Sequence, residues 1–501
     1  MKQSFHHLHT ITLVLLFALK ALAQEPIDNG LFNVDKLHRI HINSYEDIDL
    51  WELIDREYIK VKVRIGSSSI DSVGIKLKGS TSIYAEQKPL ALDFNEYVKG
   101  QKYQGLTKLN LRNNFKDTTL MRERLAYEIY RRAGLPSPRT AYAEVYVNDT
   151  FRGIYTVSET VDKIFLRDHY PNGKGSLYKG EFDFRGFNIE VKEGTIEAYE
   201  VFERYNTPIN LHEYVHLDHF LRQMAVDIII GDWDSYAYHR HNFYIYHEPI
   251  SQKLHFINWD HNYAFSDPLE NLNPYPKGTF PSEINLIEEP GLRSKFEQTI
   301  CKLLKYATNE NYINEQIEKY TNILNSSQEQ FTISPRTQLK SYISKRTQLL
   351  TDTLSNLGIS CHSDPPVEKQ EILINEIHYS TNGNWIELHN KTNRPIELKE
   401  NYYLSNDVNF PKKWKIESNL EIPPRGYICL KENSSIDEEQ IYAPFKIRKK
   451  GGTLILTHEN LYEIHRITYP KLEKEMSFIR EHFENGDNQL SQPTFKAPNS
   501  N

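Results

Sequence analysis

Alternating apolar and polar residues dominate residues 36–105, in segments such as VKVRI, VGIKLKG and LALDF. This two-residue period is typical of strands with one face toward a core, and it predicts an antiparallel sheet. Periods of three to four residues predict helices in three further segments: 117–133, 217–230 and 296–357. Strand-like and helical segments together predict an α+β domain before residue 362.

Beyond residue 370 the pattern is that of strands alone. Seven short strand-like segments, from ILINEIHYS to EIHRITY, are separated by turn residues, as in an immunoglobulin-like sandwich. The stretch before them, HSDPPVEKQ at 362–370, combines two prolines with charged residues and predicts a linker. We therefore expect an all-β sandwich over residues 371–501.

The first 23 residues have the features of a signal peptide. Lys2 precedes the apolar run ITLVLLFAL, which is too short to span a bilayer, and Ala21-Leu22-Ala23 is a small-x-small cleavage site. Cleavage after Ala23 predicts an exported protein that is periplasmic, cell-surface or extracellular. An uncleaved anchor is the alternative. No later run approaches ~18 apolar residues, so we expect no transmembrane segment after cleavage.

Composition narrows the class of protein further. The chain has 501 residues, which exceeds a single core, and 39% of them are hydrophobic. A net charge of −7 without a block of Lys and Arg argues against nucleic acid as a partner. Of three cysteines, Cys301 and Cys361 could bridge the ends of one helical segment after export. Cys429 is expected to be a buried thiol in the second domain.

The segment with the clearest chemistry is a predicted hairpin, in which FYIYH (243–247) and KLHFINW (253–259) form two strands. Asn242 enters the first strand and Asp260 leaves the second, so the two residues should lie close together. Asp234 follows the helix at 217–230 and should reach the same edge. Carboxylate and amide oxygens suit Mg²⁺ or Mn²⁺ that holds a nucleotide phosphate. The alternative is a solvated hairpin whose Asp and Asn residues serve turns.

The order of these residues is also that of a protein kinase, in which a catalytic Asp precedes an Asn, a hairpin and a metal-binding Asp. On this interpretation Asp234 orients or deprotonates the acceptor hydroxyl. Asn242 and Asp260 hold the metal that bridges the phosphates of ATP.

At this point the chain resembles the CotH family of atypical kinases, named for spore coat protein H. The resemblance spans roughly residues 31–361 and rests on these blocks: DSVGIKLKGSTS (71–82), KPLALDFNEYVKGQ (88–101), LTKLNLRNNFKDTTLMRERLAYEIYRRAGLPSPRTAYAEVYVND (106–149), RGIYTVSETVDKIFL (152–166), GSLYKGE (175–181), GDWDSY…HNFYIY (231–246) and FINWDHNYAF (256–265). It implies a two-lobed kinase-like fold and the use of ATP. Asp232 stands where family members commonly carry Asn.

A small polar turn, Gly79-Ser80-Thr81-Ser82, lies between two predicted strands of the first lobe. Its backbone N–H groups, at Ser80 and Ser82, could cradle phosphate, although such a turn is often only a turn. Lys76, Lys78 and Lys88 lie around it. Lys88 matches a lysine of the family's block and is our choice for the lysine that pairs with a phosphate.

Two glutamates complete the predicted nucleotide site. Glu123, in the helix expected from the N-cap candidate Asp117 onward, could form a salt bridge with a lysine as the αC glutamate of a kinase does. A surface pair within the helix is the alternative. Glu159 lies in SETVD, where a kinase connects its lobes and holds the adenine.

Four segments of the second domain resemble the lamin tail domain, an immunoglobulin-like module: INEIHY…NWIELHN (374–390), YYLSND (402–407), KKGGTLILT (449–457) and QPTFKAPN (492–499). The resemblance implies a binding or targeting role and an envelope or matrix partner.

The function expected from these features is that of an exported atypical kinase. It would transfer the γ-phosphoryl group of ATP to Ser/Thr hydroxyls of an envelope or extracellular protein. The sequence has no G-x-S-x-G elbow for a nucleophilic hydrolase. Two alternatives stay open: a non-catalytic surface or adhesion protein on a kinase-like scaffold, and a metal-dependent phosphohydrolase.

Overall fold

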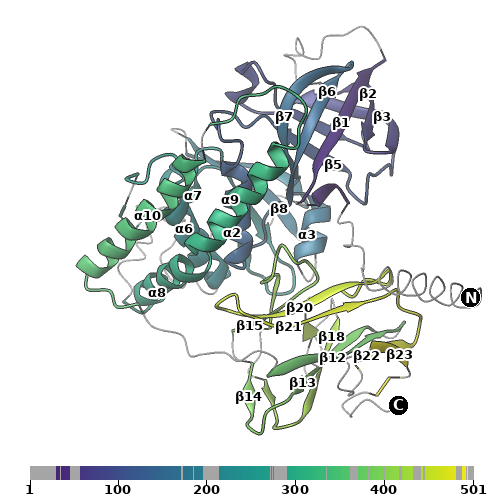
Figure 1. Cartoon of the computed structure of the whole chain (residues 1–501), viewed down its shortest axis with the longest axis vertical. Coiled ribbons are helices and arrows are strands. Elements are labelled where there is room, and N and C mark those ends of the chain that lie inside the picture. Colours follow the sequence, from purple (N-terminus) through teal and green to yellow (C-terminus); the bar gives the residue numbers. More distant parts are fainter. Residues whose placement is uncertain are drawn as a thin grey trace, which may run out of the picture.

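The computed structural model describes these residues: 30–33, 35–45, 57–170, 173–183, 186–195, 214–270, 272–273, 275, 290–334, 336–361, 371–381, 383–398, 401–416, 420–432, 442–443, 446–480, 488–491 and 493–494. The predicted signal peptide and the predicted linker at 362–370 lie outside them. A barrel lies at one end of the molecule, helices occupy the middle, and a second group of strands lies at the other end (Figure 1). The architecture is mixed α+β.

The first part is a closed seven-stranded barrel in the order β1-β2-β3-β4-β5-β7-β6. The strands are β1 (Leu37–Ser44), β2 (Ile59–Ile65), β3 (Ser68–Leu77), β4 (Leu90–Asp93), β5 (Lys108–Arg112), β6 (Thr140–Val147) and β7 (Thr150–Glu159), with the 3₁₀ turns η1 (Gly30–Phe32) and η3 (Ser82–Tyr84). All neighbours pair antiparallel except β1 and β6, which close the barrel in parallel. Burial alternates along β2, where Val61 and Val63 are fully buried, as the predicted two-residue period requires.

Helix α2 (Arg122–Arg132) follows the barrel strand β5. It begins later than the sequence predicts, because Lys116 and Leu120 adopt positive φ angles of 59° and 61° and form a turn. Asp117 still serves the helix start, since its Oδ2 accepts a hydrogen bond from the N–H of Arg122 at 2.8 Å. Gly134, with φ of 84°, ends the helix.

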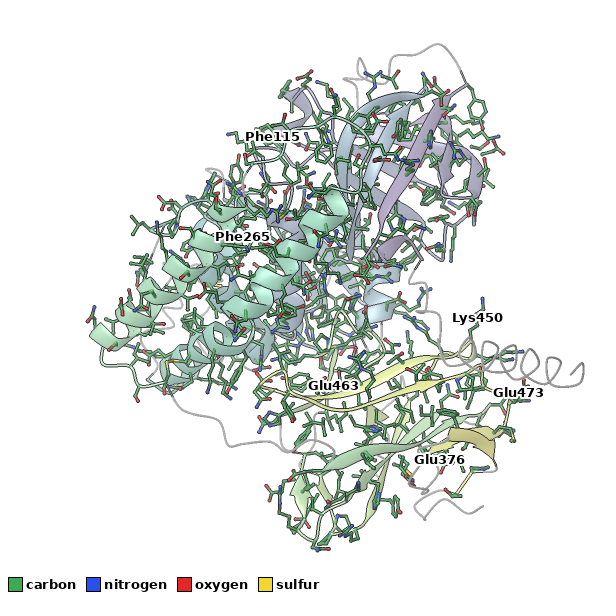
Figure 2. The ribbon with its side chains drawn as sticks, in the orientation of Figure 1. Phe115, Phe265, Glu376, Lys450, Glu463 and Glu473 are labelled. Atoms are coloured by element: carbon green, nitrogen blue, oxygen red, sulfur yellow. A yellow bond between two sulfur atoms is a disulfide. The ribbon has the colours of Figure 1, made fainter. Side chains whose placement is uncertain are left out.

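The middle part is a four-stranded sheet, β11-β10-β8-β9, covered by helices. Its strands are β8 (Ser176–Asp183), β9 (Gly186–Glu193), β10 (Phe243–His247) and β11 (Leu254–Asn258), and its helices are α3 (Lys163–His169), α6 (Leu217–Ile230), α7 (Tyr236–His239), α8 (Pro290–Tyr306), α9 (Glu310–Leu324) and α10 (Thr337–Asn356). Helix α6 has the predicted bounds, and the left-handed Gly231 ends it. After the sheet comes Phe265, which is labelled in Figure 2 and is buried. Its ring centre lies 5.4 Å from that of Tyr342 in α10.

A disulfide joins Cys301 of α8 to Cys361, which lies beyond the end of α10. The two Cα atoms are 5.5 Å apart, so the predicted pairing is confirmed. Cys429 is a buried free thiol, also as predicted.

The C-terminal β region, residues 371–494, contains a six-stranded sheet, β19-β18-β13-β12-β22-β23, a four-stranded sheet, β16-β15-β20-β21, and the pair β14-β17. Its strands are β12 (Ile372–Tyr379), β13 (Trp385–Asn390), β14 (Ile396–Glu397), β15 (Tyr402–Ser405), β16 (Trp414–Lys415), β17 (Glu421–Ile422), β18 (Tyr427–Glu432), β19 (Tyr442–Ala443), β20 (Gly452–His458), β21 (Glu463–Tyr469), β22 (Met476–Arg480) and β23 (Asn488–Ser491). Apolar residues of both larger sheets share one core, for example Leu388 and Leu454. The predicted all-β character is confirmed.

No helix in the described part of the chain is both long enough and apolar enough to cross a membrane.

Candidate functional site

The β10–β11 hairpin positions Asn242 and Asp260 as the sequence predicts. Phe243 pairs with Asn258, so the residues that flank the two strands lie at one end of the hairpin. The carbonyl of Asn242 accepts a hydrogen bond from the N–H of Trp259 at 3.1 Å. Asn242 and Asp260 both adopt left-handed backbone conformations, with φ of 57° and 60°. The chain therefore turns sharply at both positions, which lie at the same end of the hairpin.

Asp234 reaches this edge from the loop after α6. Its Oδ2 accepts a hydrogen bond from Asn242 Nδ2 at 3.0 Å, and the same amide nitrogen donates to the Asp234 backbone carbonyl at 3.1 Å. Its other carboxylate oxygen lies 3.1 Å from His241 Nδ1. The side chain of Asp234 is 23% exposed, so a ligand can reach the carboxylate while its orientation is held.

Asp260 belongs to a network that runs into helix α2. Its carboxylate forms an ion pair with Arg112, and Arg112 Nε lies 3.1 Å from Glu123 Oε2. Tyr127 donates to Glu123 Oε1 at 3.1 Å and accepts from the Asp260 N–H at 3.2 Å. Glu123 is buried, so it is not a surface pair within the helix, and its cationic partner here is Arg112 rather than a lysine. Burial raises its pKa, although Arg112 opposes the effect.

Lys78 and Arg112 form the positive side of the site. Lys78 Nζ donates to Asn110 Oδ1 at 2.7 Å and lies 5.0 Å from the centre of the Trp259 ring. Burial, followed by the nearby charges of Arg112 and Lys179, lowers the pKa of Lys78 to about 7. A nearby anion would favour the protonated form of this amine, because opposite charges attract.

The predicted phosphate turn and Lys88 lie next to each other in the barrel. Lys88 Nζ donates to the carbonyl of Ile83 at 2.9 Å. Gly79 has a φ of 152°, and an added Cβ there would approach Ser82 Oγ to 2.3 Å, so the turn closes tightly on itself. Thus Lys88 is engaged by the turn's own backbone, and phosphate binding by Lys88, Ser80 and Ser82 stays a prediction.

Glu159, at the end of β7, forms a bidentate pair with Arg139, with Oε1 2.6 Å from Nη2 and Oε2 3.0 Å from Nε. The Glu159 N–H also donates to the Arg139 carbonyl at 3.0 Å. The carboxylate is buried, and its role at the adenine stays a prediction.

A buried network below the site supports the loop that carries Asp234. Asp232 is fully buried, with Oδ2 2.8 Å from His261 Nδ1, and His261 stacks on Tyr130 at 4.7 Å. Tyr130 donates to Asp227, which also accepts the N–H of Ala237 at 3.1 Å. Burial raises the pKa of Asp227 to about 7. Asp232, which departs from the family's Asn, is therefore a supporting residue rather than one that faces a ligand.

Sequence reasoning missed Arg112, and it placed Lys78 only near the turn. The available signal was positional, since Lys78 follows strand β3 directly and Arg112 ends strand β5. Functional side chains lie at strand ends and in the following loops more often than inside strands. Only the folded chain shows that both of these side chains lie beside Trp259.

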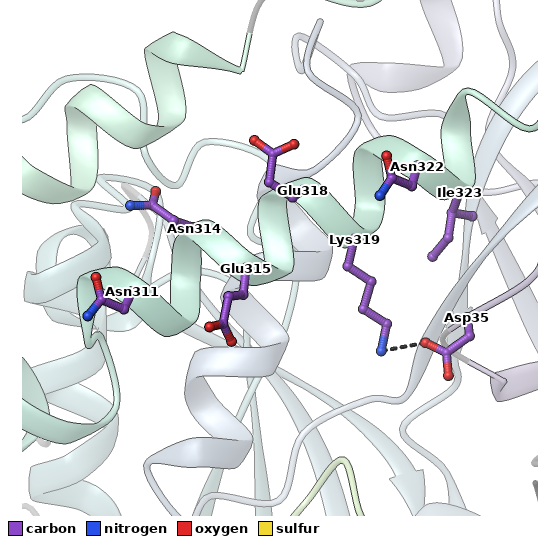
Figure 3. A pocket seen from close by; sticks show the side chains of 8 residues that line it. All are labelled: Asp35, Asn311, Asn314, Glu315, Glu318, Lys319, Asn322 and Ile323. Atoms are coloured by element: carbon purple, nitrogen blue, oxygen red, sulfur yellow. Dashed lines mark ion pairs between the residues drawn. The ribbon is translucent and has the colours of Figure 1, made fainter.

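An open cavity of about 770 Å³ lies elsewhere, along one side of α9 (Figure 3). Its lining residues are Asp35, Asn311, Asn314, Glu315, Glu318, Lys319, Asn322 and Ile323. Lys319 crosses it to form an ion pair with Asp35 at 2.5 Å. None of the predicted site residues lines it.

Comparison with known protein families shows to which family this chain belongs. The family model described as CotH kinase protein matches residues 75–350, which contain every predicted site residue. The chain belongs to the CotH family. Spore coat protein homolog 1 of Rhizopus delemar is 24% identical to it over 55% of this chain and 52% of that protein. Inner spore coat protein H of Bacillus subtilis is 21% identical over 43% of this chain and 63% of that protein. The chain thus spans between half and two thirds of these CotH relatives.

Among solved structures, a Helicobacter pylori proinflammatory kinase, CtkA, aligns with 61% of this chain and 98% of its own length. The sequence identity is 12% and the TM-score is 0.24. A likeness this distant carries no argument here, and the CotH assignment rests on the family match.

Proposed function

We propose that this CotH protein is an exported atypical kinase that transfers the γ-phosphoryl group of ATP to Ser/Thr hydroxyls of an envelope or extracellular protein. The observation that carries the proposal is the hydrogen bond between Asn242 and Asp234 at 3.0 Å, at the hairpin edge that also holds Asp260. Of the two carboxylates there, Asp260 pairs with Arg112 and lies near Lys78, which adds two cationic side chains to the edge. This combination suits a polyanionic nucleotide and a divalent metal.

Asn242 and Asp260 fit the metal Mg²⁺ or Mn²⁺. The amide nitrogen of Asn242 is committed to Asp234, which leaves its carbonyl oxygen as the free ligand atom. Asp260 engages Arg112 through Oδ1 and keeps Oδ2 for an ion. A divalent ion held by these two residues would supply positive charge that neutralises the phosphates during transfer.

Asp234 acts on the acceptor in this proposal. Asn242 Nδ2 donates one hydrogen bond to Asp234 Oδ2 and one to the Asp234 backbone carbonyl, which together hold the carboxylate in place. Its partial exposure lets a hydroxyl approach. It orients that hydroxyl and accepts its proton as the hydroxyl oxygen bonds to the γ-phosphorus. The bond between that phosphorus and the bridging oxygen breaks in the same transfer, and ADP leaves.

We assign the phosphate-pairing role to Lys78 rather than Lys88, because Lys78 lies beside Trp259 and near Arg112 and Asp260. Glu123 holds Arg112 in place. Ser80 and Ser82 contribute backbone N–H groups over the phosphates, and Glu159 marks the adenine end.

Export and the second domain belong to the same proposal. The N-terminal segment predicts secretion, and matched relatives are named for a spore coat and, in Rhizopus delemar, as invasins. The C-terminal β region, resembling a lamin tail domain, would hold the kinase at an envelope or matrix partner. The proposed units are residues 31–361 and 371–501.

The direct test is incubation of the protein with labelled ATP and Mn²⁺, followed by mass spectrometry for phosphorylated Ser and Thr. The kinase proposal expects label on the protein or an added acceptor, and loss of it in Asp234→Asn. ATP binding without transfer indicates the non-catalytic scaffold. Release of inorganic phosphate without any labelled acceptor indicates a phosphohydrolase. Either of the last two results overturns the proposal.

A further inference from the structure

Three histidines meet at the opposite end of α6 from Asp234. His216 precedes the helix, His219 lies in its first turn, and His255 lies in strand β11. Their possible ligand atoms all lie within 4.8 Å of one another. The helix has 14 residues, so about 20 Å of helix separates this group from the kinase site. None of these three histidines belongs to the nucleotide site proposed above.

The spacing of the ring nitrogens matches ligands on one metal ion. His219 Nδ1 and His255 Nδ1 are 3.4 Å apart. Two nitrogens at the Zn–N distance of about 2.0–2.1 Å, at tetrahedral angles, lie about 3.3–3.4 Å apart. The rings of His216 and His255 are stacked with centroids 4.6 Å apart, which keeps the third imidazole beside the other two.

The backbone holds this arrangement without an ion. Val215 forms a parallel bridge with Leu254, and the N–H of His216 donates to the Leu254 carbonyl at 3.0 Å. His216 Nδ1 accepts the N–H of His219 at 3.3 Å as the helix cap, so Nε2 is its ligand atom. The edge of the Tyr170 ring packs against His255 at 5.0 Å.

The neutral imidazole is the form that binds a metal ion. Asp218, between two of the histidines, is committed to Arg222 at 3.0 Å and Lys415 at 3.3 Å and does not compete.

We propose that His216, His219 and His255 bind a divalent transition-metal ion of the zinc class, with water in the fourth position. His255 is buried whereas His216 and His219 are partly exposed, which gives the ion an entry path and leaves room for the water. The ion would tie the start of α6 to β11. A sequence signal existed, because residues 212–216 read HEYVH, the H-E-x-x-H spacing of zinc proteins. Among the described residues, the second of these histidines lies with His219 and His255; His212 is outside them.

The test is Co²⁺ binding to the full chain, because four-coordinate Co²⁺ gives an intense visible absorption band. The proteins all carry His6, His7 and His9 replaced by Gln, so that the N-terminal histidines contribute nothing. We expect the band in this parent, its displacement by one equivalent of Zn²⁺, and its loss in His219→Gln and in His255→Gln. His241→Gln, which changes the histidine beside Asp234, should retain it.

Thermal unfolding gives the second readout. Zn²⁺ should raise the melting temperature of the parent and of His241→Gln, but not that of His219→Gln or His255→Gln. If a buried variant fails to fold, His216→Gln, at a partly exposed position, replaces it. Absence of the band in the parent, or a band and a Zn²⁺ shift that survive in His219→Gln and His255→Gln, would show that the three imidazoles only hydrogen bond and stack.

Discussion

Arg222 of helix α6 and Glu459, in the turn between β20 and β21, form a buried salt bridge of 2.8 Å between the helical part and the C-terminal β region. Lys412 lies 3.2 Å from the same Glu459 oxygen, and Tyr403 donates to the other one. Asp218 joins the network through Arg222 at 3.0 Å and also pairs with Lys415 at 3.3 Å. A charged network this deeply buried fixes one orientation, because each charge is costly once its partner is removed.

Replacing Glu459 should therefore loosen the contact between the two parts. Glu459→Gln removes the carboxylate that pairs with buried Lys412 and leaves Arg222 with Asp218 alone, at a cost of about 3–5 kcal/mol. Urea unfolding and proteolysis within 362–370 are the measurements, and the variant should be cut faster. Glu463→Gln is the matched control, since Glu463 (Figure 2) pairs with Arg466 at the surface and contributes ~0–1 kcal/mol. Equal effects of the two substitutions would contradict the prediction.

Acid should weaken the same contact. Burial alone would raise the pKa of Glu459, but Arg222 and Lys412 outweigh it and lower the pKa to about 2. A carboxylate whose pKa is lower in the folded state than in the unfolded state stabilises the fold fully when the pH is above its unfolded pKa. This contribution is lost as the pH falls toward its folded pKa. Stability measured from pH 6 downward should fall below about pH 4.5, with a smaller fall in Glu459→Gln. An identical profile in both proteins would contradict this.

Substitutions of Asp260 and Asp234 should affect different steps, the first ATP binding and the second phosphoryl transfer. Asp260→Asn removes a metal-binding charge and should weaken Mn²⁺-dependent ATP binding on the order of 100-fold or more. Asp234→Asn should keep ATP binding and lower transfer, because its role is toward the acceptor. Calorimetry with ATP and Mn²⁺ separates the two, with Asp71→Asn, on the barrel surface, as control. Equal loss of binding in both variants would argue against the assigned roles.

Lys78 should make ATP binding depend on pH. Its pKa of about 7 means that the free amine loses its proton as the pH rises, whereas bound phosphate requires the charged form. ATP affinity should therefore fall between pH 7.5 and 9, by up to about tenfold per pH unit. Lys78→Arg should flatten the profile because arginine stays protonated. Lys88→Arg is the control and should leave the pH profile of ATP affinity unchanged. A flat profile in the parent protein would show that Lys78 does not pair with the phosphates.

Reducing the disulfide should destabilise the helical part. Cys301 and Cys361 close a loop with a sequence separation of 60 residues, and a bridge of this length contributes about 2–4 kcal/mol. Thermal unfolding with and without dithiothreitol should show a lower melting temperature under reduction. Cys429→Ala, which changes the free thiol, should keep that response, and Cys301→Ala should abolish it.

Local pattern was sufficient for several elements. The apolar stripe and Gly231 determine helix α6 over Leu217–Ile230, and β-branched and aromatic residues around a turn determine the β10–β11 hairpin. The placement of Asn242 beside Asp260 follows from that hairpin. These features depend on residues close in sequence, for which backbone propensity and hydrophobic period carry the information.

The tertiary structure alone decided the partners of the charged groups. Arg112 meets Asp260 across 148 residues, Glu123 pairs with that arginine rather than with a lysine, and His216 joins His255 from another element. A charge or an imidazole has no period in sequence, and many cations could equally satisfy each carboxylate. Which pair forms depends on how the barrel, helix α2 and the hairpin pack, because that packing determines which groups are buried together and must neutralise or ligate one another.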